Sequence, residues 1–105
     1  MTESIFKHIK NLVATIPKGK VTTYGLVAQA LSLGSARVVG WALRGNQNQQ
    51  IPCHRVVQKS GTLSPGFSLG GWCHQRRLLH REGLKFSGRQ IKNFETVLFV
   101  PKPNF

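Results

Sequence analysis

Two short helical stretches separated by a tight, glycine-containing turn most limit how this chain can fold. The first stretch covers residues 24–33, where the threonine pair 22–23 offers a cap and Gly34 ends the helix. Ser35 can cap the second stretch, which is predicted to run to about Arg44. This succession is typical of a helix-turn-helix, and an ordinary helical hairpin is the alternative.

The flanking residues predict a mixture of helices and strands. Thr2 can cap a first helix, and apolar residues at helical spacing from Ile5 to Ile16 support it. A further helix is expected over 72–81. Segment 51–58 is rich in β-forming residues, and the apolar run 97–100 indicates an edge strand. We therefore expect a small α/β domain, with a winged-helix-like helix-turn-helix core and a short sheet that carries Cys53.

The charge of the chain indicates a polyanionic partner. Fifteen Lys and Arg against three Asp and Glu give a formal charge of +12 and a pI of about 11.1. Nucleic acid is the first candidate partner, an anionic membrane surface is the second, and a merely soluble basic surface is the alternative. No stretch approaches the roughly 18 apolar residues of a membrane span, and the N-terminus is too polar for a signal peptide. We expect one monomeric domain over 1–105, without membrane association, in the cytoplasm (at the nucleoid in a bacterium) or in a eukaryotic nucleus.

Cys53 is the candidate nucleophile, because its neighbours in sequence can favour the thiolate. His54 and Arg55 follow it directly, and Glu82 is available to orient the histidine, so a Cys-His-Glu relay is chemically sensible. The alternative is a cysteine that serves only as a small buried hydrophobic residue. Cys73 lacks the same neighbours and is interpreted as a packing residue. The two Cys-His pairs are too closely spaced for a typical zinc site, and neither a metal nor a cofactor is expected.

The pentapeptide at 52–56, Pro-Cys-His-Arg-Val, resembles the active-site signature of O6-alkylguanine-DNA alkyltransferases. Four further segments resemble that family in the family's own order: 17–25, 36–40, 44–46 and 78–83. Together these pieces cover roughly residues 5–86. The resemblance implies the catalytic half of the family, without its N-terminal domain, and assigns no role to the tail 87–105.

The resemblance implies a role in alkyl transfer for several residues. Cys53 would attack the alkyl carbon in one irreversible displacement, and His54, through a water and Glu82, would help to ionise it. Tyr24 would donate a proton to the leaving guanine and support its extrusion from the duplex. Asn46 would stabilise the turn between the recognition helix and the active-site strand.

The resemblance also implies how DNA is held. Arg37 would enter the duplex from the minor groove and fill the space left by the flipped base. Ser35, Ala36 and Gly40 are small enough to let this helix approach the groove closely. Arg55 is expected to add a further DNA contact.

A pocket for the flipped guanine is implied by the same resemblance. The carbonyl groups of Cys53 and Val56 would accept the exocyclic amine of guanine, and the backbone of Ser68 would donate near the guanine oxygen. Phe67 stands in the pocket loop where the family usually has tyrosine, so it keeps a stacking face and loses a hydroxyl group. The implied partner is double-stranded DNA that contains alkylated guanine.

Three departures from the family pattern leave a second function open. Segment 68–71 is one residue longer than the usual loop, Trp41 replaces a small residue, and Gln75 stands where active members usually carry lysine. The last of these, with the short single-domain form, points to the similar alkyltransferase-like proteins. Those proteins bind the lesion without transfer and hand it to excision-repair proteins, but usually lack the cysteine that this chain retains at Cys53. A generic helix-turn-helix regulator is a third possibility, which leaves the pentapeptide unexplained.

Overall fold

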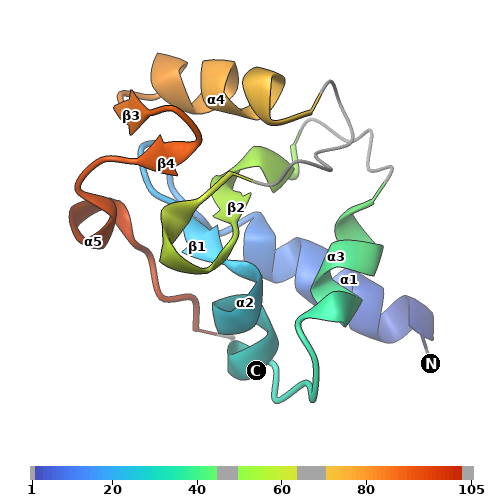
Figure 1. Cartoon of the computed structure of the whole chain (residues 1–105). Coiled ribbons are helices and arrows are strands. Elements are labelled where there is room, and N and C mark those ends of the chain that lie inside the picture. The colour runs from blue at the N-terminus through green and yellow to red at the C-terminus, as the bar shows by residue number, and fades with distance from the viewer. Residues whose placement is uncertain (1, 45–49, 64–70, 103–105) are drawn as a thin grey trace.

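The computed structural model describes residues 2–44, 50–63 and 71–102. In chain order, the elements of this part are α1 (Thr2–Val13), β1 (Thr22–Thr23), α2 (Tyr24–Ala30), α3 (Arg37–Leu43), the 3-10 turn η1 (Cys53–Arg55), β2 (Val56–Val57), the 3-10 turn η2 (Lys59–Gly61), α4 (Gly71–Arg81), β3 (Phe86–Ser87), β4 (Gln90–Ile91) and α5 (Phe94–Val97). In Figure 1 the β1–β2 pair lies between two groups of elements, with α4 and the β3–β4 hairpin above it and α2 below it. The predicted α/β class is confirmed.

The helix-turn-helix stretch forms largely as predicted. The hydroxyl group of Thr23 accepts a hydrogen bond from the backbone N–H of Leu26 at 3.1 Å and so caps α2. The helix ends at Ala30, earlier than expected, because Ser32 adopts a left-handed backbone conformation with φ of 56°. The Ser35 hydroxyl accepts from the N–H of Arg37 at 3.1 Å, and α3 begins at that arginine.

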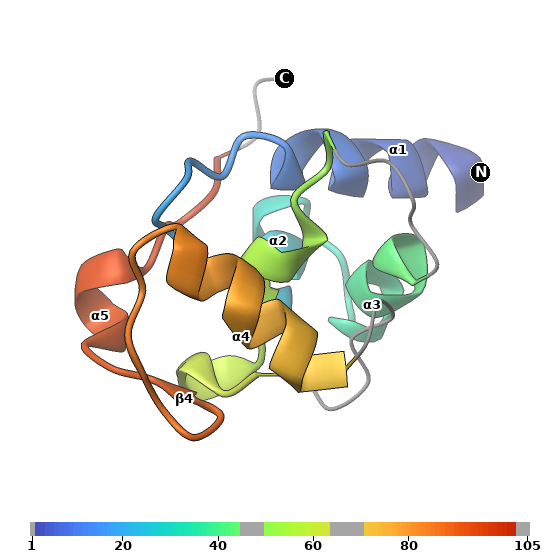
Figure 2. The ribbon, with the colours of Figure 1, turned by 90° about the horizontal axis from the view of Figure 1, so that it is seen from above.

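The first three helices bury their apolar sides against one another, as the spacing in the sequence requires. We call this cluster the helical core; its buried members are Ile9, Leu12, Val13, Ile16, Val27, Ala28, Val39, Ala42, Leu43 and Val56. Figure 2 shows α1, α2 and α3 gathered on the side of the molecule away from α5. The contribution of Val56 connects this core to the strand that follows Cys53.

The second cluster, which we call the C-terminal core, is assembled from distant segments. Its buried members are Val21, Val57, Leu63, Leu79, Leu84, Phe86 and Ile91. Helix α4 ends at Arg81, as predicted, and Gly83 follows with φ of 102°, while the N–H of Leu84 donates to the carbonyl group of Leu79 at 3.2 Å. The chain then turns back through the β3–β4 hairpin, which the sequence did not predict.

The short parallel sheet joins the two cores. Thr22 pairs with Val56 and Thr23 with Val57. Because successive side chains of a strand point to opposite faces, Val56 enters the helical core and Val57 enters the C-terminal core. The expectation that the sheet itself carries Cys53 is corrected: that residue begins the 3-10 turn directly before β2.

The apolar run 97–100 was expected to form an edge strand, and this is wrong in part. Val97 is the last residue of α5, and only a single bridge follows, between Leu98 and Val21. The N–H of Val21 donates to the carbonyl group of Val97 at 2.9 Å, and the N–H of Phe99 donates to that of Val21 at 2.7 Å. The tail therefore completes the C-terminal core. Within the described ranges, no helix combines the length and apolar character needed to cross a bilayer.

Candidate functional site around Cys53

Cys53 lies on a tight turn that is held by its own backbone. Its N–H donates to the carbonyl group of Ile51 at 2.8 Å, and the N–H of Arg55 donates to that of Pro52 at 2.9 Å. The carbonyl group of Cys53 itself accepts from the N–H of Val56, where the turn passes into β2. The side chain of Cys53 is half-buried against the helical core, and the cysteine is not in a disulfide.

His54 and Glu82 meet as the sequence predicted. The Nε2 atom of the imidazole lies 2.7 Å from Oε2 of the carboxylate, and the two side chains are only 16% and 9% exposed. The carboxylate can accept a hydrogen bond from Nε2–H, which leaves Nδ1 of a neutral ring as the nitrogen with a free lone pair. The pair can therefore take a proton from a neighbouring thiol, directly or through a water molecule.

Arg55 faces inward and contacts the same carboxylate. Its Nε donates to Oε1 of Glu82 and its Nη2 donates to Oε2, both at 2.9 Å, while Nη1 donates to the carbonyl group of Ile16 at 2.8 Å. All three guanidinium nitrogens are thus engaged within the protein. This geometry offers no support for the expected DNA contact and instead makes Arg55 an anchor for Glu82.

The protonation state of Glu82 follows from these contacts. Burial raises the pKa of the Glu82 carboxyl, but the hydrogen bonds and charges of Arg55 and His54 outweigh burial and hold that pKa below its ordinary value. The backbone N–H of Gly19 adds a long contact of 3.5 Å to Oε1. Glu82 is therefore a carboxylate at neutral pH, as the relay requires.

Gln75 belongs to the site in a way that sequence reasoning missed. It is fully buried on α4, and its Nε2 donates to the carbonyl groups of His54 and Val56, at 3.1 Å each. In the sequence it stood out only as a departure from the family pattern. Its position one helical turn before Leu79, on the apolar side of α4, was the signal that could have placed it inside.

The residues expected at the DNA lie on the first turns of α2 and α3. Tyr24 is half-buried against the helical core, whereas Arg37 is exposed at the start of α3. Ser35 and Ala36 are exposed just before that helix, and a Cβ atom built on Gly40 would meet nothing within 4 Å. Asn46, Phe67 and Ser68 lie outside the described residues.

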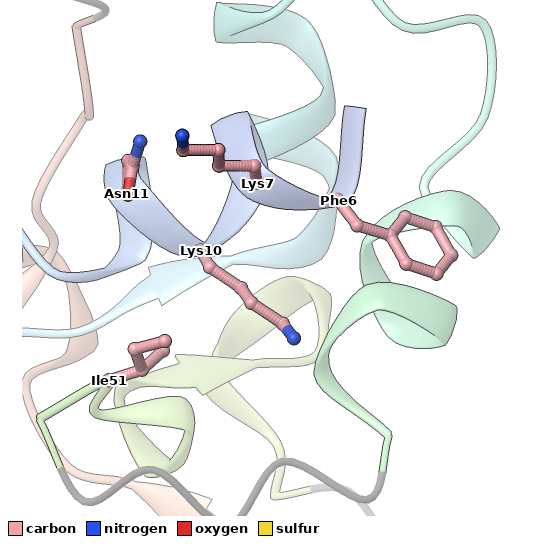
Figure 3. A pocket seen from close by; sticks show the side chains of 5 residues that line it. All are labelled: Phe6, Lys7, Lys10, Asn11 and Ile51. Carbon is pink, nitrogen blue, oxygen red and sulfur yellow. The ribbon is translucent and has the colours of Figure 1, made fainter. Parts of the chain in front are cut away.

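A separate hollow with a volume of about 420 Å³ lies beside α1. Its lining residues are Phe6, Lys7, Lys10, Asn11 and Ile51. In Figure 3 the Lys10 side chain projects on the side of Ile51, while Phe6 points away from both. None of the residues predicted for chemistry lines this hollow. Among the described residues, no three His, Cys, Asp or Glu side chains gather closely enough to hold a metal ion.

Known proteins resemble this chain in sequence and in fold. The chain is 37% identical over 97 residues to a bifunctional methyltransferase/endonuclease of Thermoplasma volcanium, which covers 90% of this chain. The chain spans only 30% of that relative's length. It is 43% identical over 89 residues to a DNA base-flipping protein of Escherichia coli, covering 82% of this chain and 67% of that protein.

The fold has a counterpart among solved structures. A crystal structure of Schizosaccharomyces pombe Atl1, in complex with damaged DNA containing O6-carboxymethylguanine, superposes with a TM-score of 0.79. The two are 27% identical, and the match covers 92% of this chain and 95% of that one. Residues 4–84 match the sequence model described as the DNA-binding domain of 6-O-methylguanine DNA methyltransferase. The chain therefore belongs to the 6-O-methylguanine DNA methyltransferase family of DNA repair proteins.

Proposed function

We propose that this chain repairs DNA by turning an O6-alkylated guanine out of the duplex and moving the alkyl group onto Cys53. The observation that carries the proposal is the 2.7 Å contact between Nε2 of His54 and Oε2 of Glu82. His54 directly follows the cysteine in the chain. A methyl group on an aromatic oxygen is a poor electrophile, so its transfer needs a thiolate. An oriented imidazole next to the thiol is a common means of producing one.

The proposed step balances without a cofactor. The sulfur of Cys53 forms a bond to the alkyl carbon as the bond from that carbon to guanine O6 breaks, and the bonding electron pair stays with the guanine. The thiol proton passes through water to His54, and the Tyr24 hydroxyl supplies a proton to the leaving guanine. The proton gained by His54 is then released to solvent, and the Tyr24 phenolate takes one up from solvent. The product is a thioether, so each protein molecule acts once.

The exposed face of α3 supports docking on a duplex. Arg37, Trp41 and Arg44 are all exposed, and their spacing of four and three residues places them on one side of the helix. Two cations that flank an aromatic ring suit the phosphates and sugars of a minor groove, and the net charge of +12 adds general attraction. We propose that Arg37 fills the space left by the flipped base.

A second candidate function is recognition of the same lesion without transfer. It is favoured by the neutral amide of Gln75 behind the Cys53 turn, where active family members usually carry a lysine. A neutral group adds no positive field that would favour the thiolate. In this case excision-repair proteins would act on the marked lesion after binding.

Mass measurement separates the two functions. The protein is incubated with a duplex that contains O6-methylguanine, and the peptide with Cys53 is analysed. A gain of one methyl group, absent in Cys53→Ala and kept in Cys73→Ser, is expected for transfer. Tight lesion binding without a mass change would contradict transfer and support the binder. Sequence-specific binding without lesion preference would contradict both and support a helix-turn-helix regulator.

A further inference from the structure

Gln75 on α4 donates two hydrogen bonds to backbone carbonyl groups of the segment that follows Cys53. Its side chain is 0% exposed, and its Nε2 donates to the carbonyl oxygens of His54 and Val56, both at 3.1 Å. The orientation of the amide is fixed by chemistry, since only the NH₂ end can face two acceptors. Helix α4 thus holds the carbonyl groups of the two residues that flank Arg55.

The other end of the same amide shows what this arrangement costs. Among the described residues, no donor reaches the buried Oε1 atom of Gln75. A leucine or methionine at this position would fill a similar volume without burying an unpaired acceptor. The reason for a glutamine here therefore lies in the two bonds that it donates.

The Val56 carbonyl is the more informative of the two acceptors. Under the proposed function, this oxygen receives the exocyclic amine of guanine. A peptide oxygen has two lone pairs, so it can accept from Gln75 and from a base at the same time. A carbonyl held by a buried donor cannot turn away from the direction that the turn gives it, and accepting one hydrogen bond polarises it for another.

We propose that Gln75 is a positioning residue that makes the pocket selective for purines that carry the exocyclic amine. The inference rests on the proposed function, because it assumes that Val56 faces the flipped base. It concerns recognition and not sulfur chemistry, so it holds for a transferring protein and for a lesion binder alike.

The test compares two lesions that differ only in that amine. Binding constants are measured for duplexes with O6-methylguanine and with O6-methylhypoxanthine, which has hydrogen in place of the amine. The unmodified protein is expected to prefer O6-methylguanine by about tenfold, the change that one hydrogen bond of ordinary strength produces. Gln75→Leu is expected to bring this preference to within about twofold.

Three further variants make the result specific. Gln75→Met fills the same space with a flexible chain and substitutes for the leucine variant if that one does not fold. Gln75→Lys restores a donor and is expected to recover the preference for O6-methylguanine. This variant also tests the positioning role if both apolar variants unfold. Gln58→Leu makes the same change at an exposed glutamine and is expected to leave the preference at its original value. Thermal unfolding confirms that each variant is folded.

The outcomes distinguish a failure of the proposed function from a failure of the positioning role of Gln75. If the unmodified protein does not distinguish O6-methylguanine from guanine, the proposed function fails. If it distinguishes the two methylated bases and a folded Gln75→Leu or Gln75→Met does so equally well, the positioning role is wrong. A folded Gln75→Lys without preference for the amine also overturns it.

Discussion

The helical core and the C-terminal core differ in how far along the chain their partners lie. The helical core takes nearly all its members from three consecutive helices, and Val56 is the one that follows them. The C-terminal core joins Val21 to segments near the other end, including Phe86, Ile91 and the Leu98 bridge. The Cys53 turn lies where the two meet, so it depends on both.

The two cores also contribute different things to the site. The helical side supplies Cys53 and Tyr24, which would react, and the exposed arginine of α3. The C-terminal side supplies Glu82 and Gln75, which hold the turn in place. The proposed binding to DNA and the proposed activation of the thiol should therefore be lost through substitutions in different parts of the molecule.

The largest expected effect is on the C-terminal core itself. Leu79→Ala removes a fully buried side chain from α4 and is expected to lower the free energy of unfolding by about 2–5 kcal/mol. Urea denaturation measures the loss. The neighbouring Leu78, only half-buried, gives the matched control, and Leu78→Ala should cost clearly less. If the two variants lose the same free energy of unfolding, the complete burial of Leu79 gives it no larger role in this core than Leu78 has.

The next effect is on the reaction. Glu82→Gln keeps the shape of the side chain but removes the charge that orients His54 and is expected to slow transfer to Cys53 by about a hundredfold. Single-turnover kinetics with O6-methylguanine DNA measure the rate. Glu95→Gln changes an exposed acid on α5 and should leave the rate unchanged. A Glu82→Gln rate equal to that of the unmodified protein would remove the relay from the mechanism.

A smaller effect is expected from the other side of the molecule. Arg37→Ala should weaken binding to a lesion duplex by about tenfold, because an exposed cation at the start of α3 is lost. The melting temperature should not change. Lys92→Ala removes an exposed positive charge next to the C-terminal core and is expected to weaken binding by less than about twofold. Equal losses would mean that only net charge matters.

The smallest expected effect is on the stability of the fold at acidic pH. The pKa of Glu82 lies below its ordinary value of 4.5, so the carboxylate stabilises the fold above that pH, and this stability is lost as the pH falls through the lowered value. Urea titrations at a series of pH values below about 5 should show a steeper loss for the unmodified protein than for Glu82→Gln. Parallel curves would contradict this, since the variant lacks the titrating group.

The sequence predicted most of the helical core because its information is local. Helical spacing, the Thr23 cap and the glycine breaks each act within a few residues, and α1 to α4 appear close to their expected ranges. The α3 helix starts one residue later than expected, because Ala36 and not Ser35 occupies its N-cap position. The bridge at Val21 depends on Leu98, far away in the chain, which a local pattern does not reveal. The β3–β4 hairpin pairs residues only three to five positions apart, but its strands of two residues are too short to show an alternating pattern.

The site divides in the same way. The pairing of His54 with Glu82 was predicted from the residue types and then from the family resemblance, and the structure brings the two together. Adjacency in sequence could not show that Arg55 turns inward, because side-chain direction on a tight turn depends on the fold around it. Gln75 was missed for a related reason, since the carbonyl groups that it serves become neighbours only when α4 packs behind the turn.

The bridge between Val21 and Leu98 has a consequence for the order of events on the ribosome. The amino end emerges first, so α1, α2 and α3 can associate while the rest of the chain is still being made. Val21 must wait until Leu98 has left the exit tunnel before it finds its partner. Cys53 and His54 are thus synthesised before Glu82, and the contact between His54 and Glu82 can form only after the segment that holds Glu82 has emerged.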